Sequence, residues 1–147
     1  MNSKVNIIIL DSNFILLPFQ FKIDYLNEIR HIIEGELKFI IYQQVLNELE
    51  SKKKRKPHAT KFIRLLDSGL SYLDNHKGDY DINFSDDIKN IEESTDDFLL
   101  RKIVHLKNKG NNVFLATNDS DLRKKARERY INTIFLRQKK YLSIERI

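Results

Sequence analysis

The chain has 147 residues, of which 41% are hydrophobic, and it carries a formal net charge of +5 and no cysteine. This length suits a single core, so we expect one domain over residues 1–147, and the lack of cysteine excludes disulfides and thiolate metal sites. The apolar run before Asp11 is too short for a signal peptide or a membrane span, so we expect a cytoplasmic protein without membrane contact.

The amino-terminal part begins with a segment that is apolar at almost every position. Residues 5–10 are rich in β-branched side chains, which predicts a strand that is buried on both faces and ends at Asp11. The elements expected next are a short helical turn closed by Pro18, a helix over residues 21–33 stopped by Gly35, a strand over residues 37–42 and a helix over residues 43–50. Residues 52–56 are all cationic, and we expect them to form a mobile loop that ends at Pro57.

The rest of the chain repeats this alternation. The expected elements are a helix over residues 58–73, a loop over residues 74–93 with one short strand near Ile82, a helix from Ser94 to Gly110, a strand over residues 113–116, a basic helix over residues 122–129 and a strand over residues 131–136. A short tail follows. Alternating strands and helices without repeats are typical of a parallel sheet wrapped by helices, so we predict an α/β fold of three layers, α/β/α, with a mostly parallel central sheet.

Acidic residues stand at four places where a predicted strand ends or the next helix begins. These residues are Asp11, Glu48, the pair Asp96 and Asp97, and Asp119 with Asp121. A parallel sheet gathers the carboxyl ends of its strands along one edge, so the fold would bring these carboxylates towards one cleft. Their repulsion would raise their pKa values unless a divalent cation neutralised them, which predicts a Mg²⁺ or Mn²⁺ site that keeps water and phosphate as its other ligands.

The same acidic residues also have a structural explanation. Ser94 with Asp97 fits a capping box, Asn118 with Asp121 fits another, and Asp11 could cap the helix that it precedes. Capping does not require the four places to converge, so their convergence would distinguish the two explanations. The four histidines are scattered without metal-ligand spacing and predict no site.

Basic residues gather in two segments of the chain. The candidates for RNA contact are Lys52, Lys53, Lys54, Arg55 and Lys56 in the first segment, and Arg123, Lys124 and Arg127 in the second. A basic surface beside a concentrated acidic spot suits a polyanion held against metal-binding carboxylates. Solvated charge without a partner is the alternative for each segment.

Four acidic motifs in order carry a resemblance to a known family. The motifs are Ile-Leu-Asp11-Ser-Asn13-Phe, Val-Leu-Asn-Glu48-Leu, Thr-Asp96-Asp97-Phe-Leu-Leu and Ala-Thr117-Asn118-Asp119-Ser-Asp121-Leu-Arg. Together they resemble the ordered acidic motifs of the PIN-domain nucleases over nearly the whole chain. Residues 18–22 and 135–142 are most similar to the branch that contains the small-subunit ribosomal RNA processing endonucleases and their archaeal relatives.

The resemblance implies a PIN-like fold and a metal-dependent endoribonuclease that hydrolyses RNA phosphodiesters, with ribosomal RNA processing as a candidate role. It assigns metal binding to Asp11, Glu48, Asp97 and Asp119, nearby support to Asp96 and Asp121, and the orientation of ligands or water to Asn13, Thr117 and Asn118. The doubled Asp96-Asp97 leaves open which carboxylate faces the site. RNA is the implied partner, and a second copy of the chain or a ribosome-assembly protein are further candidates.

Three other functions stay open from the sequence. A non-catalytic RNA-binding module would use the basic segments without cleavage, and a toxin-type ribonuclease of a toxin–antitoxin pair would share the chemistry. A receiver-like phosphoryl-transfer domain would use Asp11 as phosphate acceptor. That function expects a lysine after a late strand, where this chain has Thr117-Asn118-Asp119.

Overall fold

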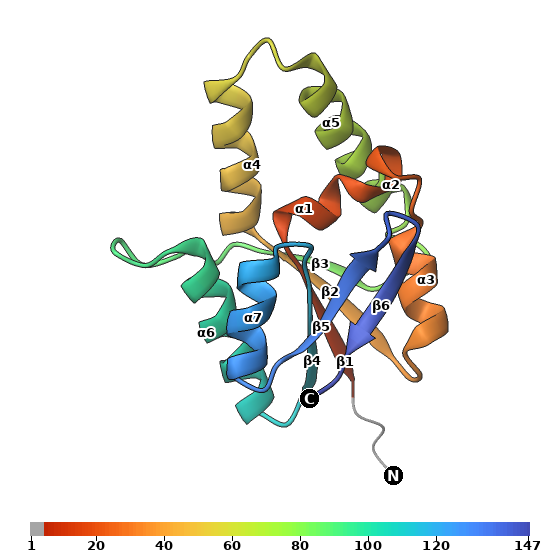
Figure 1. Cartoon of the computed structure of the whole chain (residues 1–147), viewed down its shortest axis with the longest axis vertical. Helices are drawn as coiled ribbons and strands as arrows, with labels where there is room; N and C mark the ends of the chain where they lie inside the picture. The colour runs from red at the N-terminus through yellow and green to blue at the C-terminus, as the bar shows by residue number, and fades with distance from the viewer. Residues whose placement is uncertain (1–4) are drawn as a thin grey trace.

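The computed structural model describes residues 5–147 and contains a six-stranded sheet with helices on both faces (Figure 1). The strands are β1 Asn6–Leu10, β2 Leu37–Tyr42, β3 Ile82–Ser85, β4 Asn112–Ala116, β5 Asn132–Arg137 and β6 Tyr141–Glu145. They lie in the order β3-β2-β1-β4-β5-β6, and only β6 runs antiparallel to its neighbour. This arrangement confirms the predicted three-layer α/β/α fold.

Strand β1 lies at the centre because its side chains need cover on both faces. Every residue from Asn6 to Leu10 is buried, and Ile8 lies opposite Phe39 of β2 and Phe114 of β4. Near-continuous apolar runs of this kind are typical of parallel strands that are covered by helices on both sides. The carboxyl ends of β1 and β4 are therefore adjacent at one edge of the sheet.

The helices begin and end close to the predicted boundaries in most cases. Their bounds are α1 Ser12–Ile15, α2 Leu17–Gln20, α3 Tyr25–Ile32, α4 Gln43–Arg55, α5 Thr60–Asn75, α6 Thr95–Asn108 and α7 Ser120–Glu128. Figure 1 shows α6 and α7 on one face of the sheet and α3 on the other, while α4 and α5 extend beyond the sheet edge. No helix within residues 5–147 is long and apolar enough to cross a membrane.

The prediction of a mobile loop over residues 52–56 is wrong, because α4 continues to Arg55. Lysine and arginine are good helix formers, and cations in the last turn interact favourably with the negative end of the helix dipole. The helix also packs there, since the Lys52 ammonium lies 4.5 Å from the centre of the Phe62 ring of α5. Only Lys56 lies outside the helix, and its N–H still donates to the Lys52 carbonyl.

Three other local predictions need correction. Pro18 does not close a helical turn but lies in the first turn of α2. The N–H groups of this turn have no partner within the helix, so the missing N–H of proline costs no hydrogen bond. The helix expected over residues 21–33 begins only at Tyr25, because the Asp24 side chain caps it by accepting from the Asn27 N–H. The expected tail contains β6, whose Leu142 side chain is buried against the core.

Gly69 allows α5 to cross α1 at very short range. A Cβ atom at this position would lie 2.0 Å from the Ile15 carbonyl oxygen and 3.3 Å from the Ile15 Cγ2 atom. Backbone atoms cannot move aside as a flexible side chain can, so only glycine fits this contact. The contact holds α5 against the helix that directly follows Asp11.

We expect Gly69→Ala to lower the free energy of unfolding by about 1–3 kcal/mol, because the methyl group overpacks the crossing. Alanine is otherwise better than glycine inside a helix by about 1 kcal/mol, so the clash must outweigh this gain. Urea denaturation measures the difference. Gly78→Ala is the matched control, since a Cβ atom there meets nothing within 4 Å. A Gly69→Ala protein as stable as the control would contradict the close contact.

Candidate active site

Asp11 is a buried carboxylate at the junction of β1 and α1. Its side chain is only 6% exposed, because the strand that carries it is covered on both faces. One oxygen, Oδ1, accepts a hydrogen bond of 2.8 Å from the Ser12 N–H and so caps the short helix α1. The capping explanation is thus correct for one oxygen of this residue.

The second oxygen of Asp11 is bound by side chains from both adjacent segments. The Thr117 hydroxyl at the end of β4 donates to Oδ2 at 2.6 Å, and the Asn13 amide donates to the same atom at 3.3 Å. A carboxylate offers about four lone-pair positions, and these contacts with the Ser12 bond use three of them. One position therefore remains for a ligand.

Asn118, which follows β4, links α1 to strand β5. Its backbone N–H donates to the Asn13 side-chain oxygen at 3.0 Å, and its side-chain oxygen accepts from the Leu136 N–H at 2.8 Å. The predicted capping box that starts at Asn118 is therefore wrong by one residue. Asp119 caps α7 instead, with Oδ1 accepting from the N–H groups of Asp121 and Leu122.

The carboxylates of four segments interact through their charges. Burial raises the pKa of Asp11 above its ordinary value, and the charges of Asp96 and Glu48 raise it further against the opposing Thr117 and Ser12 hydrogen bonds. Burial also raises the pKa of Asp96, to which the charges of Asp119 and Glu48 contribute. The fold therefore brings Asp11, Glu48, Asp96 and Asp119 towards one another, as capping alone would not require.

Two of the acids that the resemblance assigned to the site, Asp97 and Asp121, do not contribute to the pKa shift of Asp11. Asp97 is exposed, and its backbone N–H donates to the Ser94 hydroxyl oxygen that caps α6. Asp121 is exposed in the first turn of α7. Successive residues of a helix point about 100° apart, so Asp96 and Asp97 cannot both face Glu48. The charges of Glu48 and Asp119 act on the Asp96 carboxylate, which favours Asp96, rather than Asp97, as the member of the pair that faces the other acids.

The four carboxylates approach one another without forming a closed metal cage. Within residues 5–147, no three His, Asp or Glu side chains lie close enough to hold one ion by themselves. A cation could reach the group, because Glu48 and Asp119 are exposed and Asp11 has one unused lone-pair position. Any ion bound here would keep other ligands, such as water or phosphate.

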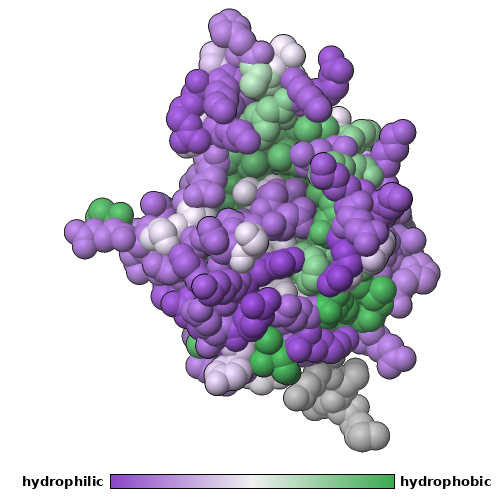
Figure 2. All heavy atoms as spheres, in the orientation of Figure 1, coloured by the Kyte–Doolittle hydropathy of each residue, from purple (hydrophilic) through white to green (hydrophobic). Residues whose placement is uncertain are grey.

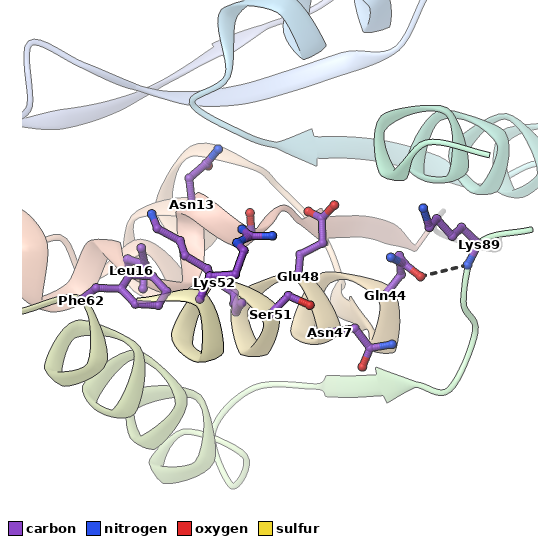
Figure 3. A pocket seen from close by; sticks show the side chains of 12 residues that line it. Asn13, Leu16, Gln44, Asn47, Glu48, Ser51, Lys52, Phe62 and Lys89 are labelled. Carbon is purple, nitrogen blue, oxygen red and sulfur yellow. Dashed lines mark hydrogen bonds between the residues drawn. The ribbon is translucent and has the colours of Figure 1, made fainter. Parts of the chain in front are cut away.

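A cleft of about 520 Å³ opens between α1, α4 and α5, and of the four acids Glu48 lines it. Figure 2 shows apolar surface in the hollow between α4 and α5, bordered by hydrophilic side chains. In Figure 3, Glu48 lies along α4 between Gln44 and Lys52, with Phe62 at the Lys52 end and Lys89 at the Gln44 end. The cleft therefore extends from Glu48 to a basic and partly apolar end.

The family follows from a comparison of the sequence with family models. A model described as the PIN domain matches residues 8–137. The chain belongs to the PIN domain family. It is 28% identical over 138 residues to the protein named Ribonuclease VapC4 of Methanocaldococcus jannaschii, which covers 93% of this chain and 95% of the relative.

Two solved structures have the same fold at low sequence identity. The PIN domain endonuclease Utp24 superposes with a TM-score of 0.67 at 20% identity, covering 96% of this chain and 92% of the other. A domain of a functionally unknown protein from Methanocaldococcus jannaschii superposes with a TM-score of 0.60 at 17% identity, covering 92% of both chains. These likenesses establish the fold.

In this PIN domain, only some of the basic residues predicted to contact RNA line the cleft. Lys52 and Arg55 line the cleft, whereas its lining includes none of Lys53, Lys54, Lys56 and the second basic segment. Arg127 pairs with Glu145 through two hydrogen bonds of 2.6 and 3.1 Å, and Arg123 lies 4.0 Å from the centre of the Phe135 ring. These two arginines fasten α7 to β5 and β6, while Lys124 is exposed.

Several residues of the site were not found from the sequence. Buried Gln44 donates to the Thr95 hydroxyl at 3.3 Å and accepts from the Lys89 N–H at 3.2 Å, so it holds the loop before α6 against α4. Lys125 lies 4.0 Å from the Asp96 carboxylate. The available signal was the spacing of Gln44, Glu48, Lys52 and Arg55, which repeats every three or four residues and marks one helical face.

We expect Thr117→Val to lower the free energy of unfolding of the PIN domain by about 1–3 kcal/mol in metal-free buffer. The change removes the hydroxyl that donates to Asp11 and accepts from the Asp119 N–H at 3.1 Å, so the Asp119 N–H loses this partner and Oδ2 of buried Asp11 keeps only the Asn13 bond. Chemical denaturation measures the loss. Thr117→Ser keeps the hydroxyl and should lose less than half as much stability. Equal losses in the two variants would exclude this role of the hydroxyl.

Proposed function

We propose that the chain is a metal-dependent endoribonuclease that hydrolyses RNA phosphodiesters with Mg²⁺ or Mn²⁺. The observation that carries this proposal is the approach of Asp11, Glu48, Asp96 and Asp119 from four segments beside a cleft with basic residues. The name of the relative Ribonuclease VapC4 supports RNA as the substrate. The PIN family membership supports a nuclease.

The donor atoms at this site suit a hard divalent cation. All the acids offer oxygen, and the chain has no cysteine that would favour a softer metal. Mg²⁺ is commonly held by one or two carboxylates and keeps several waters, which agrees with carboxylates that interact without enclosing an ion. Asp11, Glu48, Asp96 and Asp119 would hold the ion. When bound, it would lower the pKa of a coordinated water and offset charge on the phosphate.

The remaining residues would position the groups around the reaction. Thr117 and Ser12 hold the Asp11 carboxylate in one orientation and favour its ionised form, because both donate hydrogen bonds to it. Asn13 is fixed between Asp11 and the Asn118 N–H and would orient ligands beside the carboxylate. Lys52 and Arg55 would hold backbone phosphates near Glu48. Hydrolysis by water needs no covalent intermediate on the chain.

The main competitor is an RNA-binding module without catalysis. Capping accounts for one oxygen of Asp11 and one of Asp119, and it gives no reason for Asp96 to lie beside Glu48. A pure binding module would gain nothing from acids next to its basic cleft, because carboxylates repel phosphate. Cleavage that depends on a metal distinguishes the two functions.

We expect Asp96→Asn to lower the rate of RNA cleavage about a hundredfold or more, and Asp97→Asn to leave it nearly unchanged. Each variant removes one of two adjacent carboxylates of α6, and the charges of Glu48 and Asp119 act on the Asp96 carboxylate. Loss of a metal ligand or its support typically costs 10- to 100-fold or more. The assay uses labelled RNA with Mn²⁺, with and without a chelator. Cleavage that survives the chelator, or equal rates in the two variants, would contradict the proposal.

We expect replacement of Lys52 and Arg55 by glutamine to weaken single-stranded RNA binding and to reduce its salt dependence. Each lost phosphate contact lowers the slope of log affinity against log salt by about 0.7, so the double variant should lose about 1.4. The matched control replaces Lys53 and Lys54, which carry the same charge on α4 but do not line the cleft. Equal changes in both pairs would mean that the contact depends on charge alone.

A further inference from the structure

The cleft has an apolar end that the proposed chemistry does not use. Leu16 between α1 and α2, Leu49 of α4 and Phe62 of α5 line it, and Phe62 is only partly buried. Leu16 and Phe62 lie on the Lys52 side of Glu48 (Figure 3). A polar phosphate backbone would gain nothing from this surface, so its occupant must present a flat apolar face.

We propose that the apolar end of the cleft is a base site: it binds one unpaired nucleobase of the RNA against Phe62, next to the phosphate that is cleaved. The inference rests on the proposed nuclease function and names a substrate feature for the same cleft. Aromatic side chains stack unpaired bases of any sequence, and such stacking commonly accompanies a positively charged groove that follows the backbone. Phe62 supplies the ring, and Lys52 with Arg55 supplies the charge.

The arrangement along α4 supports this placement of the base. Glu48 and Lys52 are one helical turn apart, a rise of about 6 Å, so a phosphate at Lys52 would be near the acids while its base faces Phe62. The cleft volume of about 520 Å³ is within the range of small-ligand sites. A base held in a duplex is stacked on both sides and cannot enter this end without being unpaired.

The position of Lys52 is also consistent with a Phe62 ring whose face can accept a base. Its ammonium lies 4.5 Å from the centre of the Phe62 ring, and no ion pair joins it to Glu48 although both residues lie in the described part of the chain. A cation at the ring face is held weakly at an exposed site. A base could displace it, and the freed ammonium could then bind the adjacent phosphate.

The Gly69 contact keeps the two walls of this end in place. It joins the backbones of α1 and α5, and the carbonyl that it meets belongs to Ile15, the residue before Leu16. Leu16 directly follows α1 and Phe62 belongs to α5, so this backbone contact limits how far the two side chains can separate. A preformed slot of this kind binds without the entropic cost of ordering its walls.

The test measures binding of a fluorescent six-nucleotide single-stranded RNA to the full chain in chelator, where cleavage cannot proceed. A series of the same RNA carries one abasic position each. Phe62→Leu keeps an apolar side chain but loses the ring, and its thermal melt checks the fold. Phe19→Leu is the matched control, because Phe19 is 57% exposed on α2 and lies outside the lining of the cleft.

We expect one abasic position to weaken binding to the wild type about tenfold. Phe62→Leu should bind the intact RNA about tenfold more weakly than the wild type, and the abasic nucleotide should not weaken its binding further. Phe19→Leu should behave as the wild type. An equal abasic penalty in wild type and Phe62→Leu would overturn the base site. Tight binding of a blunt duplex that depends on Phe62 would also overturn it.

A parallel cleavage assay with Mn²⁺ separates this inference from the nuclease proposal. Cleavage that proceeds without any effect of Phe62→Leu on binding overturns the base site and leaves the nuclease function. Binding that depends on Phe62, without any cleavage, supports the base site and overturns the nuclease function. A wild type that binds no RNA overturns both.

Discussion

Burial of the Asp11 carboxylate is the constraint around which the structure is organised. A carboxylate that is 6% exposed at the end of the central strand is costly unless its oxygens are hydrogen-bonded. The partners come from the segment after β1 and from Thr117 at the end of β4. Asn118 then links Asn13 to Leu136 of β5. The hydrogen bonds around the Asp11 carboxylate and Asn118 therefore fix the relative positions of the ends of β1, β4 and β5.

The structural and chemical roles of the acids are compatible because each role uses different atoms. Asp119 caps α7 with Oδ1 alone, and Asp11 caps α1 with Oδ1 while Oδ2 accepts from Thr117 and Asn13. A cap fixes the oxygen that accepts from the helix N–H groups and leaves lone pairs outside the helix. Capping therefore positions these side chains for the metal binding proposed here, and the two explanations do not compete at Asp11 and Asp119.

The sequence predicted the features that depend on local pattern. The apolar run of β1 and the alternation of strands and helices were sufficient to predict the three-layer fold. The predicted strand ends also indicated which edge of the sheet carries the acids. The orientation of Asp96 relative to Asp97 depends on where α6 packs, which no local pattern contains. Strand β6 was missed because its pairing with β5 is a tertiary contact, and the short alternation around Leu142 is a weak signal by itself.

The basic run was predicted as a loop, but residues 52–55 are helical, and this conformation determines how the run can function. In a loop, adjacent cations could all turn towards a polyanion, so the number of charges would set the affinity. In a helix, only residues three or four apart share a face, which is why Lys52 and Arg55 line the cleft and Lys53 and Lys54 do not. The same face carries Gln44 and Glu48, so one helix aligns the loop anchor, an acid and two cations. The register of α4, rather than the density of its charge, therefore determines which residues can meet a strand of RNA.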